Sequence, residues 1–268
     1  MRIALTLENP RPQTTIPVNY NYHLASCLYA ILEASSPDYA LRLHQEGYAF
    51  QGKHFKLFTF SHLLVERRRI EQDRLVLQSP TVRWLIASPV EEFVMHLANG
   101  MLQRGVVRIG SAALRVQEVT ALPMPALNPT TRFTCLSPIT MSTHTTVAGK
   151  NPLQYCRVEE DFYAKVVENL QRKYTLLTGN DGRSLSLSLA FDPDYVARRG
   201  GRIHKVLQYK DTRVFAYLAP FTAQGDVELL RVGYECGFGD GNSKGFGMVA
   251  VDTRQGADKH AEDRQDAL

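Results

Sequence analysis

The stretch GYECGFGDGNSKGFGMVAV, residues 233–251, carries six glycines and ends in an apolar run that is typical of a strand. A dinucleotide-binding glycine motif must follow a strand and open a helix, because the pyrophosphate lies on the amides of the helix N-terminus. Here the glycines follow a helix-like segment and lead into the last strand. A P-loop needs Gly-Lys followed by Ser or Thr, yet Lys244 is followed by Gly245. The stretch therefore argues against both nucleotide-binding folds.

Two interpretations of this glycine loop remain. Glycine permits positive φ and the close approach of another backbone, so successive amides could form an anion-binding nest, with Lys244 adding charge at the tip. Alternatively, the loop is a tight turn packed against a neighbouring domain, with Phe238 and Phe246 in the core. Physical reasoning from these residues alone favours the packed turn.

Apolar periodicity in the first half of the chain predicts alternating strands and helices. Ser36, Pro37 and Asp38 are N-terminal helix signals, and Gly47 is a typical helix end. Ser88 and Glu91 have the spacing of a capping box. The predicted elements are a strand at 2–7, helices at 21–34 and from Ser36 to Gly47, strands at 55–63 and 81–88, a helix after Ser88, and a strand at 105–119.

The segment ALPMPALNPTT, residues 121–131, contains three prolines and is predicted to be a linker. After it the same order of elements begins again, with a helix whose Phe162, Val166, Leu170 and Tyr174 share one face. Two successive β-α-β-β-α-β orders predict an α+β fold of two tandem ferredoxin-like (RRM-like) domains, each a four-stranded antiparallel sheet with helices on one face. We place these domains at 1–122 and 131–252, and a polar tail at 253–268.

Composition restricts the class of protein only loosely. A net charge of +4 over 268 residues is compatible with an anionic partner without requiring one. The four cysteines are scattered without CxxC pairing, which indicates neither a zinc site nor a disulfide framework. No segment has the roughly 20 apolar residues of a membrane-spanning helix, so we expect a cytoplasmic protein with no membrane contact.

Three stretches together resemble one known family. The glycine loop, LHQEGYAFQGKHFKLFTFSHL at 43–63 and TCLSPI at 134–139 are similar to the CRISPR-associated endoribonucleases that cut the repeats of precursor CRISPR RNA in type I and III systems. The resemblance covers residues 1–252 and implies two ferredoxin-like domains. It also implies cleavage of CRISPR repeat RNA without a metal ion or cofactor, by attack of the upstream ribose 2′-hydroxyl. The implied products carry a 2′,3′-cyclic phosphate and a 5′-hydroxyl.

The resemblance also implies a catalytic set of Tyr29, His44 and Lys56. Histidine titrates near pH 6.5, and the end of a helix favours its protonated form, so we expect His44 to protonate the leaving 5′-oxygen. Tyr29 would orient or deprotonate the 2′-hydroxyl, and these two roles can be exchanged. Lys56 would offset charge on the phosphorane, although Lys53 or His54 could replace it. Each residue alone has an ordinary structural explanation, and only the joint match favours catalysis.

Basic clusters are candidates for holding the RNA backbone. In the cluster from Arg198 to Lys205, a Gly-Gly turn is expected to project arginines from a hairpin between two strands. No aromatic motif for base stacking is recognisable. The predicted RNA-binding residues are Arg67 and Arg68; Arg198, Arg199, Arg202 and Lys205; and, in the glycine loop, Gly237, Gly239, Lys244, Gly245 and Gly247.

Two other classes compete with the endoribonuclease. One is a non-catalytic subunit that binds CRISPR repeat RNA, against which the presence of Tyr29, His44 and Lys56 argues. The other is a nucleotide-binding enzyme, which the order of elements around the glycine loop disfavours. Membership of a CRISPR effector complex and homodimer formation are both left open by the sequence.

Overall fold

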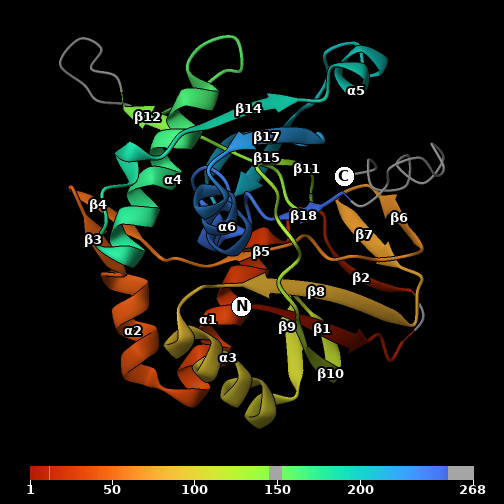
Figure 1. Ribbon diagram of the computed structural model, residues 1–268. Coiled ribbons are helices and arrows are strands. Elements are labelled where there is room, and N and C mark those ends of the chain that lie inside the picture. The colour runs from red at the N-terminus through yellow and green to blue at the C-terminus, as the bar shows by residue number, and fades with distance from the viewer. Residues whose placement is uncertain (12, 145–152, 253–268) are drawn as a thin grey trace.

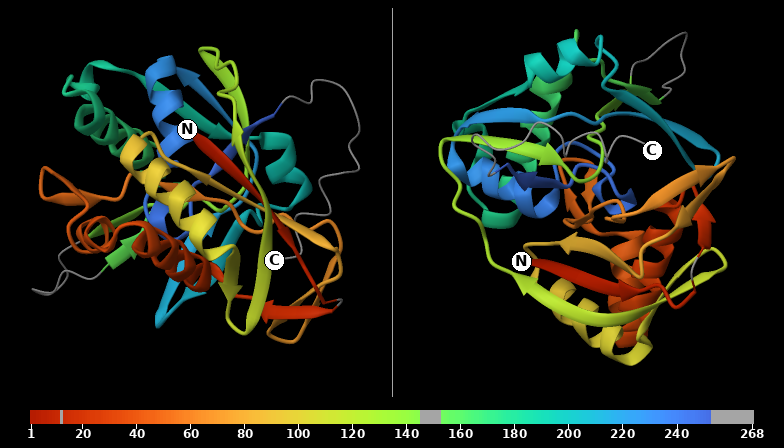
Figure 2. Two further views of the ribbon diagram at one scale, coloured as in Figure 1. Left: turned by 90° about the horizontal axis from the view of Figure 1, so that it is seen from below. Right: turned by 90° about the vertical axis from the view of Figure 1, so that its right-hand side faces the viewer.

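The computed structural model describes residues 1–11, 13–144 and 153–252, and the predicted polar tail lies outside this part of the chain. The described chain forms two units, each with an antiparallel sheet and two long helices (Figure 1). The right-hand view of Figure 2 shows the two sheets lying one above the other, joined by the segment that follows β10. This arrangement confirms the predicted α+β fold of two ferredoxin-like units.

The first sheet has five strands in the order β5-β8-β1-β10-β9. Side chains alternate across the central strand β1, and Ile3, Leu5 and Leu7 face a core shared with both long helices. The bounds are β1 Arg2–Glu8, β5 Thr59–Phe60, β8 Thr81–Ala87, β9 Val106–Ile109 and β10 Ala112–Leu122, with helices α1 Asn21–Ser35 and α3 Glu91–Arg104.

Three local predictions in this unit were wrong. The predicted strand at 55–63 is broken because Leu57 has a φ of 54°, which no strand accommodates. The predicted strand at 105–119 is a hairpin, turned at Gly110 with a φ of 61°, and it supplies the fifth strand. The capping box does not form, since the N-cap of α3 is Val90. Ser88 Oγ instead accepts from the Val90 amide and donates to the Leu57 carbonyl.

Smaller elements surround the first sheet. The helix predicted from Ser36 is α2, and a three-stranded sheet β2-β7-β6 and a hairpin β3-β4 complete the unit. Their bounds are α2 Pro37–Gln45, β2 Thr14–Pro17, β3 Tyr48–Phe50, β4 Lys53–Phe55, β6 Arg68–Glu71 and β7 Arg74–Leu77.

The second sheet has the order β14-β17-β11-β18, which repeats the topology of the first four strands of the other sheet. Its bounds are β11 Thr130–Cys135, β14 Leu187–Phe191, β17 Phe221–Gly225 and β18 Val249–Val251, with long helices α4 Phe162–Thr178 and α6 Val227–Cys236. The remaining elements are β12 Ser142–His144, β13 Leu153–Tyr155, η1 Gly182–Ser184, α5 Pro193–Arg198, β15 His204–Tyr209, β16 Thr212–Tyr217 and η2 Asn242–Lys244.

The Gly-Gly turn does not join two strands, so the predicted hairpin at this place was wrong. A short helix, α5, precedes it, and Arg198 is the last residue of that helix. Asp192 caps α5 by accepting from the Tyr195 amide at 2.7 Å, and Pro193 occupies its first turn. Gly200 and Gly201, with φ of 55° and 74°, then reverse the chain into β15.

The two units share a buried seam on the sheet face that α1 and α3 leave uncovered. Ala4 and Leu85 of the first sheet pack with Met248 of the second unit. Arg2, only 4% exposed, donates to the Tyr234 carbonyl at 2.9 Å and lies 3.7 Å from that ring. These contacts fix the glycine loop, which follows α6, against the first unit.

Candidate active site

The three catalytic candidates come together although they lie on separate elements. Tyr29 is on α1, His44 is in the last turn of α2, and Lys56 follows β4. The rings of Tyr29 and His44 are 4.9 Å apart and nearly perpendicular, at 82°. Lys56 Nζ donates to the His44 carbonyl oxygen at 2.9 Å. The Tyr29 ring therefore contacts the His44 imidazole, and the Lys56 ammonium contacts the backbone of the same histidine.

Local sequence chemistry explains this convergence. Ser36 caps α2 by accepting from the Tyr39 amide, and Pro37 starts the helix, so α2 follows α1 directly. Gly47, with a φ of 63°, then turns the chain back toward β4. A Cβ at Gly47 would lie 2.5 Å from the Phe55 carbonyl oxygen and 2.9 Å from Lys56 Cδ. Only glycine lets the Lys56 side chain reach His44 along this path.

Burial sets the protonation states of two of the three groups. Two effects raise the pKa of Tyr29 well above its ordinary value: desolvation, which is the larger, and the nearby Tyr209. Tyr29 is therefore a neutral phenol at physiological pH and can donate a hydrogen bond. Desolvation lowers the pKa of Lys56, while Glu46 opposes this shift. Lys56 remains the cation of the group, but loses its proton at lower pH than an exposed lysine does.

The two candidate replacements for Lys56 lie on the adjoining strand β4. His54 Nδ1 lies 2.7 Å from the Glu46 carbonyl oxygen. Lys53 is exposed and lines a cavity of about 600 Å³ that Lys56 also borders. The hydrogen bond from Lys56 to the His44 carbonyl favours Lys56 over these two neighbours as the catalytic cation.

The glycine loop is a packed turn against the first unit, as that interpretation predicted. Phe238 and Phe246 are buried, and Asn21 of α1 donates through Nδ2 to the Gly245 carbonyl at 3.1 Å. A Cβ at Gly245 would lie 2.5 Å from the Phe60 ring. The loop therefore contacts both α1 and β5, the elements next to the catalytic candidates.

The amides of this loop donate within the protein. Those of Gly237, Gly245 and Gly247 bond to the carbonyls of Gly233, Asn242 and Pro138. These three amides accordingly form no anion nest, and that interpretation was wrong for them. A Cβ at Gly239 would lie 2.3 Å from the Thr140 carbonyl oxygen, so this glycine too serves close packing. Contact of the four glycines with RNA stays a prediction.

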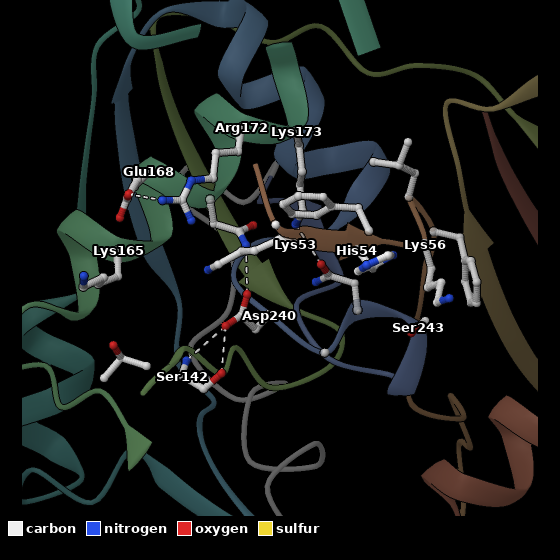
Figure 3. Close-up of a pocket in the computed structure, with 18 residues that line it drawn as sticks. Lys53, His54, Lys56, Ser142, Lys165, Glu168, Arg172, Lys173, Asp240 and Ser243 are labelled. Carbon is white, nitrogen blue, oxygen red and sulfur yellow. Dashed lines mark hydrogen bonds and ion pairs between the residues drawn. The ribbon is translucent and has the colours of Figure 1, made fainter. Parts of the chain in front are cut away.

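Lys173 of α4 holds the loop in this shape and was missed in the sequence. It is 2% exposed, and its Nζ donates to the carbonyls of Gly237 at 2.8 Å and Gly239 at 3.0 Å and to Asn242 Oδ1 at 2.7 Å. Figure 3 shows the Lys173 side chain at the edge of the cavity described above. Burial lowers the pKa of Lys173 to about 8. The sequence could have pointed to Lys173, because it lies three residues after Leu170 on the apolar face of α4. A lysine at such a position needs buried acceptors.

Aromatic side chains flank the catalytic candidates, although the sequence revealed no stacking motif. Tyr209 of β15 and Tyr22 of α1 meet edge to face at 5.8 Å. Lys244 Nζ lies 5.5 Å from the Tyr209 ring, and Lys210 Nζ lies 4.6 Å from the Tyr22 ring. The second unit therefore brings one predicted RNA-binding residue, Lys244, beside the tyrosine that neighbours Tyr29.

The two arginine-rich clusters each have a residue near His62 of the first unit. Burial lowers the pKa of His62 to about 4, with Arg68 and Lys205 as further causes, so both cations lie near this histidine. Desolvation lowers the pKa of Lys205, and the nearby charge of Arg199 lowers it further. The guanidinium groups of Arg198 and Arg199 lie 5.9 and 5.6 Å from the Tyr195 ring.

The remaining members of these clusters, Arg67 and Arg202, donate hydrogen bonds through their backbone amides. The Arg67 amide donates to Ser79 Oγ, and the Arg202 amide to the Arg199 carbonyl. All of them stay predictions as RNA contacts.

Within the described ranges, no group of three or more His, Cys, Asp or Glu side chains is placed to hold a metal ion. The four cysteines are buried and form no disulfide. None of the described helices combines the length and apolar character that crossing a bilayer requires.

Tandem ferredoxin-like units with a glycine loop before the last strand define the class of this protein. Residues 15–120 match the family model "CRISPR-associated protein Cas6, N-terminal", and residues 122–251 match "CRISPR associated protein Cas6, C-terminal". The chain belongs to the Cas6 family.

Relatives and solved structures agree with this assignment. The chain is 31% identical to a "CRISPR-associated endoribonuclease Cas6 1" of Methanocaldococcus jannaschii, over 93% of this chain and 92% of the relative. It is 29% identical to a "CRISPR-associated endoribonuclease Cas6" of Pyrococcus furiosus, over 98% and 93%. A solved structure titled "CRISPR associated protein Cas6" is 30% identical, with a TM-score of 0.75 over 94% of this chain and 98% of that one.

Proposed function

We propose that this protein is an endoribonuclease that cuts CRISPR repeat RNA in precursor transcripts without a metal ion. Support comes from membership of the Cas6 family and from the names of the relatives, which are CRISPR-associated endoribonucleases. The observation that carries the proposal is the meeting of Tyr29, His44 and Lys56, with rings 4.9 Å apart and the ammonium on the His44 carbonyl.

The proposed reaction is an internal transesterification. The 2′-oxygen upstream of the scissile phosphate attacks phosphorus, its proton passes to solvent water, and the bond from phosphorus to the 5′-oxygen of the next nucleotide breaks. His44 gives a proton to that departing oxygen, which becomes a 5′-hydroxyl, while the upstream strand ends in a 2′,3′-cyclic phosphate. Lys56 offsets the added negative charge of the phosphorane.

The environment of Tyr29 narrows the division of roles. A phenol whose pKa is raised by burial is a poor base at neutral pH but a good hydrogen-bond donor. We therefore assign Tyr29 to orienting the ribose 2′-hydroxyl and assign to His44 the transfer of a proton to the leaving 5′-oxygen. A neutral phenol costs nothing to maintain in this half-buried position, whereas a phenolate would be desolvated.

Product chemistry in the absence of divalent ions tests this proposal. Incubation of the protein with a repeat RNA in excess EDTA should give one cut, with a 2′,3′-cyclic phosphate on the upstream fragment and a 5′-hydroxyl on the downstream one. Mass spectrometry of both fragments distinguishes these ends from a 3′-hydroxyl and a 5′-phosphate. Cleavage that stops in EDTA and returns with Mg²⁺ would refute the mechanism.

The competing function is a non-catalytic subunit that binds repeat RNA. Replacing His44 by Ala separates the two functions, because it removes the proton donor but leaves the basic clusters intact. We expect His44→Ala to bind repeat RNA within about twofold of the wild type and to cut it at least about a hundredfold more slowly. An unchanged cutting rate would show that His44 takes no part in the reaction.

A further inference from the structure

The cavity beside Lys56 lies between the two units and has walls from both (Figure 3). Residues 52–58 of the first unit form one wall, and helix α4 and the loop around η2 form the others. Lysine and arginine side chains outnumber carboxylates in this lining. The cations are Lys53, Lys56, Lys165, Arg172 and Lys173, and the carboxylates are Glu168 and Asp240.

The carboxylates of the cavity are already engaged with protein donors. Asp240 accepts from the Ser142 amide and hydroxyl through Oδ2, at 3.1 and 2.9 Å, and from Asn169 Nδ2 through Oδ1 at 2.8 Å. Glu168 accepts from Arg172 Nη2 at 2.5 Å. Their negative charge is therefore partly offset by donors that are fixed in place.

Arg172 shares its charge with Glu168, and Lys173 is held by the glycine loop, whereas Lys53 and Lys165 are less fully paired. The Lys53 side chain, on an exposed strand residue that pairs with Phe50 through its backbone, makes no hydrogen bond or ion pair within the described part of the chain. Lys165 Nζ lies 3.9 Å from Asp161, at the outer limit of an ion pair. The cavity consequently keeps a positive potential and favours an anion. Its volume of about 600 Å³ exceeds what a single small anion fills, and it opens beside Lys56.

The positions of the catalytic candidates determine in which direction a bound RNA chain would run. Tyr29 neighbours Tyr209, over which Lys244 lies, whereas Lys56 borders the cavity. Ser243 lines the cavity and the next residue, Lys244, lies by Tyr209, so η2 has residues on both the cavity side and the Tyr209 side. In the proposed reaction the upstream nucleotide presents its 2′-hydroxyl to Tyr29, and the leaving 5′-oxygen faces His44 and Lys56. Nucleotides after the cut then continue into the cavity.

We infer that this cavity binds the RNA downstream of the cut, the strand that begins at the leaving 5′-oxygen, through contacts of its phosphates with Lys53, Lys165 and Arg172. The inference rests on the proposed function, because the cleavage position defines upstream and downstream. Each of these cations would contribute to affinity only when the RNA extends past the scissile phosphate.

Two repeat RNAs of one sequence test the inference. The long RNA continues for several nucleotides beyond the cut and the short RNA ends one nucleotide beyond it, and both carry a 2′-deoxy sugar at the upstream position for measurement of Kd. We expect Lys53→Met to weaken the long RNA about tenfold and to reduce its salt slope by about one, with no change for the short RNA. Lys165→Met, on the facing helix, should show the same pattern.

Arg115→Met is the control for loss of a positive charge, because Arg115 pairs with Glu8 on the first sheet, outside the cavity lining. It should affect the long and short RNAs equally. Equal weakening of both RNAs by Lys53→Met and Lys165→Met, or no weakening of either, would overturn the inference. If the wild type cuts no all-ribose repeat RNA, the proposed function fails, and a series shortened from the 3′ end still reports whether these lysines act only on 3′ nucleotides.

Discussion

Tyr29 and Lys56 show how burial selects chemical roles at the scale of single residues. Both are ordinary in the sequence: a tyrosine beside an apolar helix face and a lysine between two apolar neighbours. Their positions could be proposed only from the family resemblance, because α1, α2 and β4 converge through a capped helix start and a glycine turn rather than through any local pattern. Their protonation states, by contrast, follow from desolvation, which no linear pattern displays.

A pH profile tests the role of Lys56. The ammonium is the form that stabilises the phosphorane, and burial lowers its pKa, so activity should fall in a further step, beyond the loss of the proton that His44 donates, as the pH rises through a value below the ordinary 10.5. Arginine stays protonated throughout this range. Lys56→Arg should therefore cut more slowly at neutral pH, because its geometry differs, but should keep its activity to higher pH in single-turnover assays.

Lys53→Arg is the matched variant for this profile, since Lys53 is the neighbouring lysine on β4. It should leave the alkaline fall of the wild type in place. An alkaline fall that moves with Lys53→Arg and stays with Lys56→Arg would assign the catalytic cation to Lys53.

At the scale of elements, the glycine loop is attached to helix α4 through the Lys173 side chain. The loop was recognisable in the sequence, and its packed nature was predictable from Phe238 and Phe246. Its attachment was not, because Lys173 acts over a separation of more than sixty residues, and only the fold brings its ammonium to the Gly237 and Gly239 carbonyls. Helix α5 was missed for a simpler reason: Asp192-Pro193 is a helix start that the adjacent Gly-Gly turn obscured.

Denaturant unfolding tests the contribution of Lys173. Lys173→Met keeps the length of the side chain but leaves two buried carbonyls and Asn242 without this donor, so the free energy of unfolding should fall by about 2–4 kcal/mol. Lys165→Met, on the same helix and partly exposed, should change it by less than about 0.5 kcal/mol. Similar losses in both variants would mean that the hydrogen bonds of Lys173 to the glycine loop contribute little to stability.

At the scale of the whole molecule, the repeated order of strands and helices was sufficient to predict two ferredoxin-like units. The fifth strand of the first sheet escaped prediction because the turn at Gly110 lies inside one continuous β-like run. The seam between the units was also beyond the sequence, since Arg2 and Met248 reveal their contacts only once the two sheets are stacked. That stacking places the glycine loop beside α1 and forms the cavity next to Lys56.

The central claim is that a ribose oxygen of the substrate, assisted by side chains alone, breaks the adjacent phosphodiester bond. Single-turnover cleavage of two repeat RNAs that differ in one atom tests it most directly, one all-ribose and the other 2′-deoxy at the nucleotide just upstream of the cut. The account predicts equal affinity for both and cleavage of the all-ribose RNA alone. Cleavage of the deoxy RNA at the same bond would contradict it.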